Sequence, residues 1–136
     1  MNCNRSSPQQ EITKRTHEMR INIRINGKRL SASILDNDAA MEFVSLLPLS
    51  LSMKDLFRRE KYAPLPRPLN AKVPGQSTYA VGDIGYWAPT QDVAIYYLHD
   101  GETIPSPGII PLARIDEGAG VFNVPGEVKV TIERTD

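Results

Sequence analysis

Residues 20–34 contain the pattern that most restricts how this chain can fold. Three isoleucines alternate with polar residues, and Asn26-Gly27 follows them directly. Alternation with a period of two is typical of a strand with one buried face, and Asn-Gly is the strongest short signal for a two-residue hairpin turn. The register expected from such a turn pairs Ile25 with Lys28, Ile23 with Leu30 and Ile21 with Ala32. The two apolar faces then coincide, so we predict an antiparallel hairpin.

A short helix is predicted next. The run Asp36-Asn37-Asp38 offers side chains that can cap a helix N-terminus. Apolar residues then recur at spacings of three and four, as an amphipathic helix requires. They are Ala40, Phe43, Val44 and Leu47. Pro48 cannot continue a helix, so we expect the helix to end before it.

The rest of the chain predicts strands. Apolar residues alternate or run together in residues 49–53, 83–89, 93–98, 109–115 and 128–132. Residues 61–69 contain Pro64, Pro66 and Pro68, which lack the backbone donor of a sheet ladder and favour a stiff loop or a sheet edge. Six or seven short strands with one short helix indicate a mainly β fold, a closed or nearly closed barrel. We expect its last strand to pair with its first, because closure removes sheet edges.

The length and the net charge of the chain limit which kinds of protein it can be. We predict one domain over residues 19–136, preceded by a disordered N-terminal extension over residues 1–18, which is polar and shows no apolar periodicity. Sixteen Lys and Arg balance 16 Asp and Glu, so no excess positive charge would attract nucleic acid or a membrane surface. We expect a cytoplasmic protein, since no apolar signal segment is evident. The zero net charge also permits a homo-oligomer.

Several segments together resemble the small bacterial cyclophilin-like family. They are Ile21–Gly27, Phe43–Leu49, Glu60-Lys61 with Leu65-Pro66, Gly82–Pro89 and Ile109–Ile115. The run Gly-Asp-Ile-Gly-Tyr-Trp-Ala-Pro at residues 82–89 is the most specific of them, and the resemblance extends over roughly residues 19–122. It implies an antiparallel cyclophilin-like β-barrel capped by a short helix. It implies no particular activity, because this family is largely uncharacterised.

Cyclophilins that isomerise prolyl bonds use an arginine within a Phe-His-Arg motif and a Gln-Gly-Gly segment. Phe57-Arg58-Arg59 is similar to the first motif but lacks its histidine, and the second motif is absent. We therefore assign no catalytic residue, no cofactor and no metal. His99 stands beside Asp100-Gly101, which is first of all a turn signal.

The candidate ligand-binding residues are aromatic side chains with charged neighbours. They are Glu60, Arg67, Tyr86, Trp87 and Tyr97. Tyrosine and tryptophan combine an apolar body with a polar tip, as ligand pockets require, although the same residues also pack barrel cores and rims. Because neighbouring strand residues point to opposite faces, Tyr86 and Trp87 cannot both line one cavity.

The leading hypothesis is a non-enzymatic module that binds a small molecule or a short peptide. Two alternatives stay open. In the first, the domain is a divergent prolyl isomerase in which Arg59 or Arg67 polarises the prolyl amide. In the second, it is a structural subunit that acts through a surface for another protein or for a second copy of itself.

Overall fold

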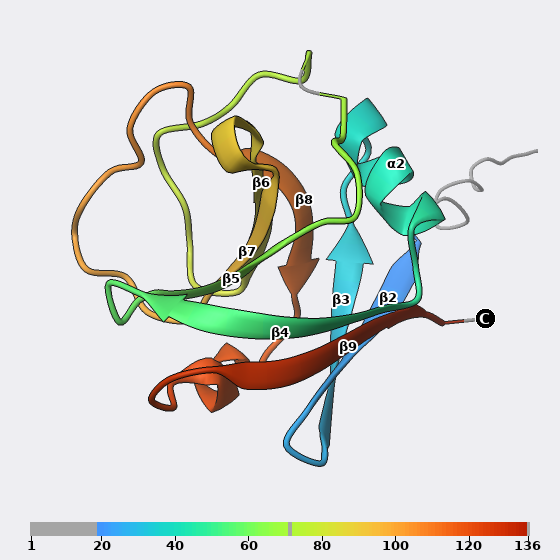
Figure 1. Ribbon diagram of the computed structural model, residues 1–136, viewed down its shortest axis with the longest axis vertical. Coiled ribbons are helices and arrows are strands. Elements are labelled where there is room, and N and C mark those ends of the chain that lie inside the picture. Colours follow the sequence, from blue (N-terminus) through green and yellow to red (C-terminus); the bar gives the residue numbers. More distant parts are fainter. Residues whose placement is uncertain (1–18, 71, 136) are drawn as a thin grey trace, which may run out of the picture.

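Among the described residues, the chain folds into a barrel of eight strands with one α-helix (Figure 1). The computed structural model describes residues 19–70 and 72–135. The strands are β2 (Arg20–Ile25), β3 (Lys28–Ile34), β4 (Leu49–Leu56), β5 (Glu60–Pro64), β6 (Asp83–Trp87), β7 (Asp92–Tyr96), β8 (Ile110–Ile115) and β9 (Val128–Arg134). The helices are α2 (Asp38–Ser45) and the 3₁₀ turns η2 (Ala88–Thr90) and η3 (Ala119–Phe122). The extension predicted for residues 1–18 lies outside the described residues.

The barrel is closed and every neighbouring pair of strands is antiparallel. The strand order is β2-β3-β8-β6-β7-β5-β4-β9, and β9 pairs with both β4 and β2. The predicted mainly β fold is therefore confirmed, as is the pairing of the last strand with the first. The prediction of six or seven strands was one or two strands short of the eight in the barrel.

The hairpin formed by β2 and β3 has the predicted register. Ile25 pairs with Lys28, Ile23 with Leu30 and Ile21 with Ala32. Asn26 and Gly27 both have positive φ, at 51° and 77°, as a two-residue turn of this kind requires. The three isoleucines are buried in the barrel interior, where they contribute to one continuous core.

Helix α2 lies at one end of the barrel (Figure 1). Asn37 is its N-cap, and the side-chain oxygen accepts a hydrogen bond from the backbone of Ala40 at 2.8 Å. The same side chain donates to the carbonyl of Pro111 at 2.9 Å, which ties the helix to β8. The helix ends at Ser45, so Leu47, which we expected within it, lies beyond its last turn.

The loop or edge predicted for residues 61–69 is wrong for its first four residues. Residues 61–64 belong to β5, which pairs with β4 on one side and β7 on the other. Pro64 is tolerated because it is the last residue of the strand, and Pro66 and Pro68 come after the strand. The three prolines therefore mark where β5 stops and do not exclude it from the sheet interior.

Side chains alternate between the inner and outer faces of the strands, and the buried apolar residues form two clusters. The larger one fills the barrel interior. The smaller one contains Tyr79, Ala94, Tyr96, Ile104 and Ile109, with Tyr62 and Trp87 packed against it. Its members on β7 alternate with Val93 and Ile95 of the interior, so this second cluster lies on the outer face of the barrel. Within residues 19–70 and 72–135, no helix is long and apolar enough to cross a membrane.

Candidate functional site

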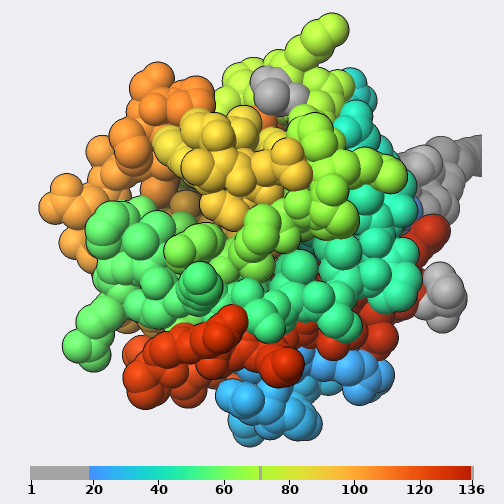
Figure 2. All heavy atoms as spheres, viewed as in Figure 1, coloured from blue at the N-terminus to red at the C-terminus, as the bar shows by residue number. Residues whose placement is uncertain are grey.

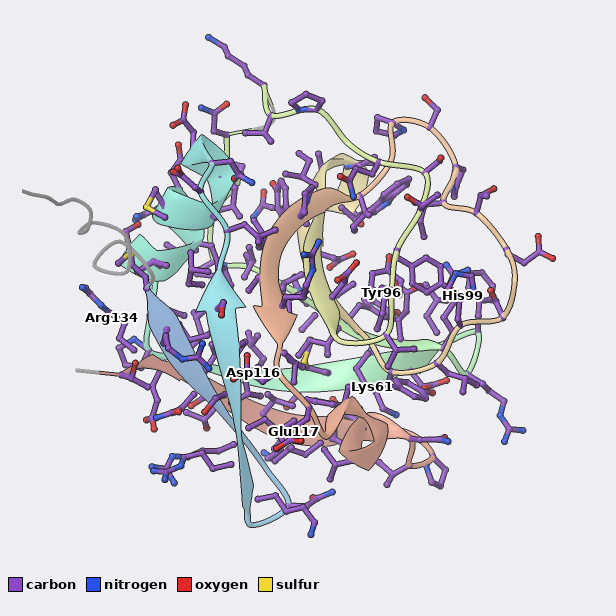
Figure 3. The ribbon with its side chains drawn as sticks, turned by 180° about the vertical axis from the view of Figure 1, so that it is seen from behind. Lys61, Tyr96, His99, Asp116, Glu117 and Arg134 are labelled. Carbon is purple, nitrogen blue, oxygen red and sulfur yellow. The ribbon has the colours of Figure 1, made fainter. Side chains whose placement is uncertain are left out.

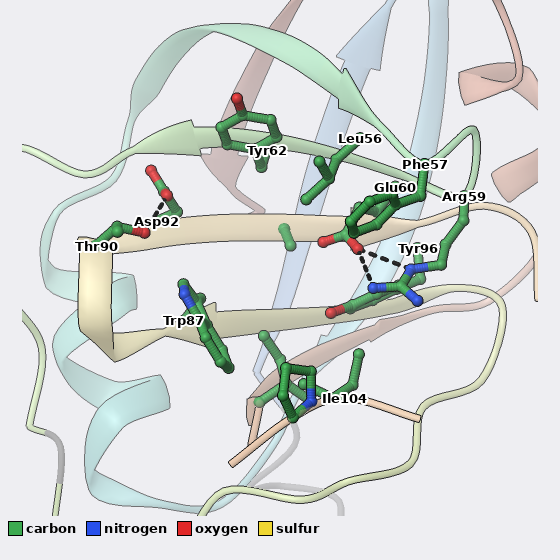
Figure 4. A pocket seen from close by; sticks show the side chains of 13 residues that line it. Leu56, Phe57, Arg59, Glu60, Tyr62, Trp87, Thr90, Asp92, Tyr96 and Ile104 are labelled. Carbon is green, nitrogen blue, oxygen red and sulfur yellow. Dashed lines mark hydrogen bonds and ion pairs between the residues drawn. The ribbon is translucent and has the colours of Figure 1, made fainter. Parts of the chain in front are cut away.

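The second cluster surrounds a cavity of about 300 Å³, which we call the outer pocket. Figure 2 shows the surface hollowed between the green segment around the β4–β5 turn, the yellow segment around η2 and the orange segment before β8. The residues that line the pocket are Leu56, Phe57, Arg59, Glu60, Tyr62, Trp87, Thr90, Asp92, Ala94, Tyr96, Ile104, Pro105 and Ile109 (Figure 4).

Three neighbouring strands form the floor of the outer pocket. Asp92, Ala94 and Tyr96 follow one another along the outer side of β7. The register places Trp87 of β6 opposite Asp92, Tyr62 of β5 opposite Ala94, and Glu60 of β5 opposite Tyr96. Because Ala94 is the smallest side chain of this row, the floor is hollow at its centre, with polar groups at both ends.

A loop before β8 forms one wall. Ile109 pairs with Gln76 through two backbone hydrogen bonds of 2.8 and 2.9 Å, and the amide of Ile104 donates to the carbonyl of Ser77 at 2.7 Å. Ile109 packs directly on Gly85 of β6, where an added Cβ would lie 2.3 Å from the Ile109 Cγ1 atom. Because Gly85 has no side chain, Ile109 of this wall can pack directly against β6.

A buried ion pair closes one end of the outer pocket. Arg59 and Glu60 are 6% and 5% exposed, and Nη2 and Nε of Arg59 lie 2.8 and 2.9 Å from Oε1 of Glu60. Arg59 Nη1 also lies 3.4 Å from Oδ2 of Asp100. Figure 4 shows that the second carboxylate oxygen of Glu60 and the hydroxyl of Tyr96 point into the pocket. The Tyr96 hydroxyl hydrogen-bonds to Glu60, so these two groups present mainly acceptor oxygens to a bound molecule.

Aromatic rings surround the guanidinium of Arg59. Its Cζ atom lies 5.1 Å from the ring centroid of Phe57, 5.3 Å from that of Tyr79 and 5.8 Å from that of Tyr96. Tyr79 stacks between Tyr96 and His99, with centroid distances of 4.4 and 4.2 Å. Figure 3 shows Tyr96 and His99 on the same side of the barrel. This stack fixes the position of the cation at distances where cation–π attraction is effective.

Burial changes the protonation equilibria at this end of the pocket. Burial raises the pKa of the Glu60 carboxyl, and the hydrogen bond and charge of Arg59 offset only part of that rise. Burial also raises the pKa of Tyr96, and the charge of Glu60 raises it further. The Tyr96 hydroxyl therefore keeps its proton, which it donates to Glu60.

A second polar cluster lies elsewhere in the barrel and joins Lys61, Asp55 and Tyr97. Lys61 Nζ donates to the carbonyls of Val124 and Gly126 at 2.6 and 2.7 Å and lies 3.1 Å from Oδ1 of Asp55. The hydroxyl of Tyr97 donates to the same carboxylate oxygen at 2.5 Å. The lysine is fully buried and each of its three ammonium protons has an acceptor, so this cluster is suited to holding the fold together.

The model of the cyclophilin-like family matches residues 23–133. The chain belongs to the cyclophilin-like family. The resemblance expected from residues 82–89 and the other segments is thereby confirmed. No curated protein matches the chain in sequence.

A solved structure supports the same fold for this cyclophilin-like domain. The solution structure of a hypothetical protein from Archaeoglobus fulgidus is similar, with a TM-score of 0.61 and 19% sequence identity. The similarity covers 87% of this chain and 95% of that chain. At this level of identity the likeness concerns the fold alone.

The cyclophilin-like barrel brings two of the five predicted ligand-binding residues together, since Glu60 and Trp87 both line the outer pocket. Tyr86 lies in the interior core, 1% exposed, where its hydroxyl accepts from the amide of Leu69. Arg67 is exposed near Ser45, and Tyr97 belongs to the cluster with Asp55 and Lys61. Whether any of the five contacts a ligand stays a prediction.

The predicted ligand-binding set did not include the other residues of the outer pocket, of which Arg59 was named only in the isomerase alternative. The alternation Asp92, Ala94, Tyr96 was a usable signal, because it places a charge, a small residue and an aromatic on one face of a strand. Nothing in the sequence indicated that residues 104–109 return to cover that face. At His99 the turn interpretation agrees with the structure, since its Nδ1 atom accepts from the amide of Gly101 at 2.9 Å.

Proposed function

We propose that this cyclophilin-like domain is a binding module that holds a small molecule or a short peptide in the outer pocket. One observation supports the proposal above the others: an aromatic cluster on the outside of a barrel is covered by a loop and yet leaves a cavity open. Ligand sites are typically apolar cavities of about 300–1,000 Å³ with a few well-placed polar groups. Glu60 and Tyr96 supply such groups here.

The tryptophan of the pocket provides a direct test, because Trp87 is the only tryptophan in the chain. Neutral 2-phenylethanol and the peptide Ala-Ala-Pro-Phe would be titrated into the full chain while Trp87 fluorescence and its indole NMR signal are followed. We expect at least one probe to shift both signals saturably. The variant Ala94→Phe fills the centre of the floor and should abolish the response, with an unchanged circular dichroism spectrum as the control for folding.

The proposal fails if neither probe changes the Trp87 signals. It also fails if the Ala94→Phe variant, still folded, responds as the unmodified chain does, because binding would then occur outside the cavity.

The position of Arg59 favours a divergent prolyl isomerase as the second candidate. Of the two arginines considered for that role, Arg59 lines the outer pocket and Arg67 does not. An arginine beside an apolar pocket could stabilise the twisted prolyl amide. Exchange spectroscopy on Ala-Ala-Pro-Phe should then show faster cis–trans exchange with the protein, and no acceleration with Arg59→Gln. If the peptide binds but its cis–trans exchange stays at the uncatalysed rate, the isomerase candidate is wrong and only the binding function remains.

A further inference from the structure

The outer pocket has an acidic end that the buried ion pair does not neutralise. Asp92 begins β7 directly opposite Trp87 and is half-buried. Thr90 Oγ1 donates to its Oδ2 atom at 2.5 Å. Within the described part of the chain, Asp92 takes part in no ion pair, so its charge lacks a protein counterion.

The charges around the pocket leave an excess of negative charge. Of the described residues that line it, the charged ones are Arg59, Glu60 and Asp92. Arg59 divides its charge between Glu60 and Asp100, so one cation faces three carboxylates in this region. A partly desolvated carboxylate without a counterion favours a bound cation, because the pocket shields the pair from water.

Two aromatic side chains stand beside the unpaired carboxylate. Trp87 lies across the β6–β7 ladder from Asp92, and Tyr62 lies opposite Ala94, two residues further along the same face of β7. Figure 4 shows Asp92 at the end of the pocket that carries Tyr62 and Trp87. Aromatic faces attract cations through their quadrupole, and tryptophan does so most strongly. A carboxylate between two such rings is the combination that recognises an ammonium group.

The centre of the pocket determines what kind of body the ligand can have beside its charged group. Ala94, Ile104 and Ile109 form an apolar surface between the acidic end and the Arg59–Glu60 pair. A cavity of about 300 Å³ lies at the small end of the range for ligand sites, so it suits a compact molecule.

We infer that the outer pocket selects a small amine, with its ammonium group at Asp92 between Tyr62 and Trp87 and its apolar or aromatic body over Ala94. This inference rests on the proposed function, because it names the class of ligand for the same cavity. It assigns Asp92 as the residue that discriminates charge, and the Arg59–Glu60 pair as the polar boundary at the far end.

A matched series of probes tests the inference on the full chain. The probes are 2-phenylethylamine, 2-phenylethanol and 3-phenylpropionate, which share an aromatic body and differ in charge. Following Trp87 fluorescence at neutral pH, we expect the amine to bind about fivefold to tenfold more tightly than the alcohol, the range of one partly exposed ion pair with a cation–π contact. The propionate should bind most weakly.

The variant Asp92→Asn keeps an acceptor for Thr90 and removes the charge. It should reduce the preference for the amine over the alcohol to about twofold or less and leave the affinity for the alcohol unchanged. Glu117→Gln is the control, because it removes one negative charge outside the pocket, well apart from Tyr96 in Figure 3. This control should retain the full preference.

Each adverse outcome has a separate meaning. If the alcohol binds as tightly as the amine, or if Asp92→Asn keeps the preference, the inference is wrong while the binding module stands. If none of the three probes binds, the inference is wrong, and the proposed function is wrong as well unless the peptide Ala-Ala-Pro-Phe shifts the Trp87 signals.

Discussion

Two consecutive charged residues of β5 face opposite sides of the barrel. Glu60 turns outward to the outer pocket, and Lys61 turns inward, where it is completely buried. Buried charges are costly unless each proton or lone pair has a partner. Lys61 meets that condition with two backbone carbonyls and the carboxylate of Asp55.

Lys61→Met should therefore destabilise the protein. The substitution keeps the length of the side chain but leaves the carbonyls of Val124 and Gly126 without this donor and removes the cation beside Asp55. We expect a loss of about 2–4 kcal/mol in the free energy of unfolding, measured by urea denaturation. Lys54→Met, on the exposed side of β4, is the matched control and should change it by less than about 0.5 kcal/mol. Equal effects of the two substitutions would show that the Lys61 contacts contribute nothing.

Asp55 should make stability depend on pH. Burial by itself raises the pKa of its carboxyl, but the hydrogen bonds from Tyr97 and Lys61 and the charge of Lys61 lower it overall. A carboxyl whose pKa is lowered by folding stabilises the protein at pH values above its pKa in the unfolded state, which is about 3.9. This stabilisation is lost as the pH falls through the pKa of the folded state. The difference in unfolding free energy between the unmodified chain and Asp55→Asn should therefore shrink from pH 7 to pH 3. A constant difference would contradict the pKa shift.

At the scale of elements, the outer pocket depends on how a loop rests on a sheet. Residues 104–109 are held by the bridge between Gln76 and Ile109, and Ile109 occupies the space that Gly85 leaves open on β6. The chain also approaches itself closely at Gly75, where an added Cβ would lie 2.2 Å from the carbonyl oxygen of Pro107. Small residues at these crossings allow the wall to form.

Gly85→Ala should disturb that wall. Its new methyl group would overlap the Ile109 side chain, and we expect a loss of about 1–3 kcal/mol in the free energy of unfolding. Ile109→Ala removes the overlapping atoms at the expense of a cavity. In a double-mutant cycle by urea denaturation, the loss of stability in the double variant should be smaller than the sum of the losses in the two single variants by about 1 kcal/mol or more. Additive losses would mean that Gly85 and Ile109 do not compete for this space.

At the scale of the whole molecule, closure of the barrel makes distant parts of the chain depend on one another. The final strand β9 lies between β2 and β4, and β8 lies between β3 and β6. The eight strands therefore leave no free edge among the described residues, and their inner faces share one core.

A chain that begins at Met19 should retain the stability and probe binding of the full chain, because the closed barrel is formed by residues 20–134. Thermal denaturation followed by circular dichroism, together with the Trp87 titrations, would check this expectation. A fall in melting temperature of more than about 4 °C, equivalent to roughly 1 kcal/mol or less for a domain of this size, would show that residues 1–18 stabilise the domain.

The sequence by itself determined the local features of this cyclophilin-like domain. The register of the β2–β3 hairpin depends on a two-residue turn and on alternation within one segment, and the start of α2 depends on the cap at Asn37. Such features are decided by backbone geometry and hydrogen bonds over a few residues, so a pattern in the chain is sufficient to predict them.

Only the tertiary structure decided which residues meet. Lys61 is buried because Asp55 and residues 124–126 converge on it, and the outer pocket exists because residues 104–109 fold over β6 and β7. These contacts join segments far apart in the chain, and their free energy depends on burial and charge pairing that no local pattern records. For the same reason Glu60 and Trp87 share a pocket, while Arg67, Tyr86 and Tyr97 lie elsewhere.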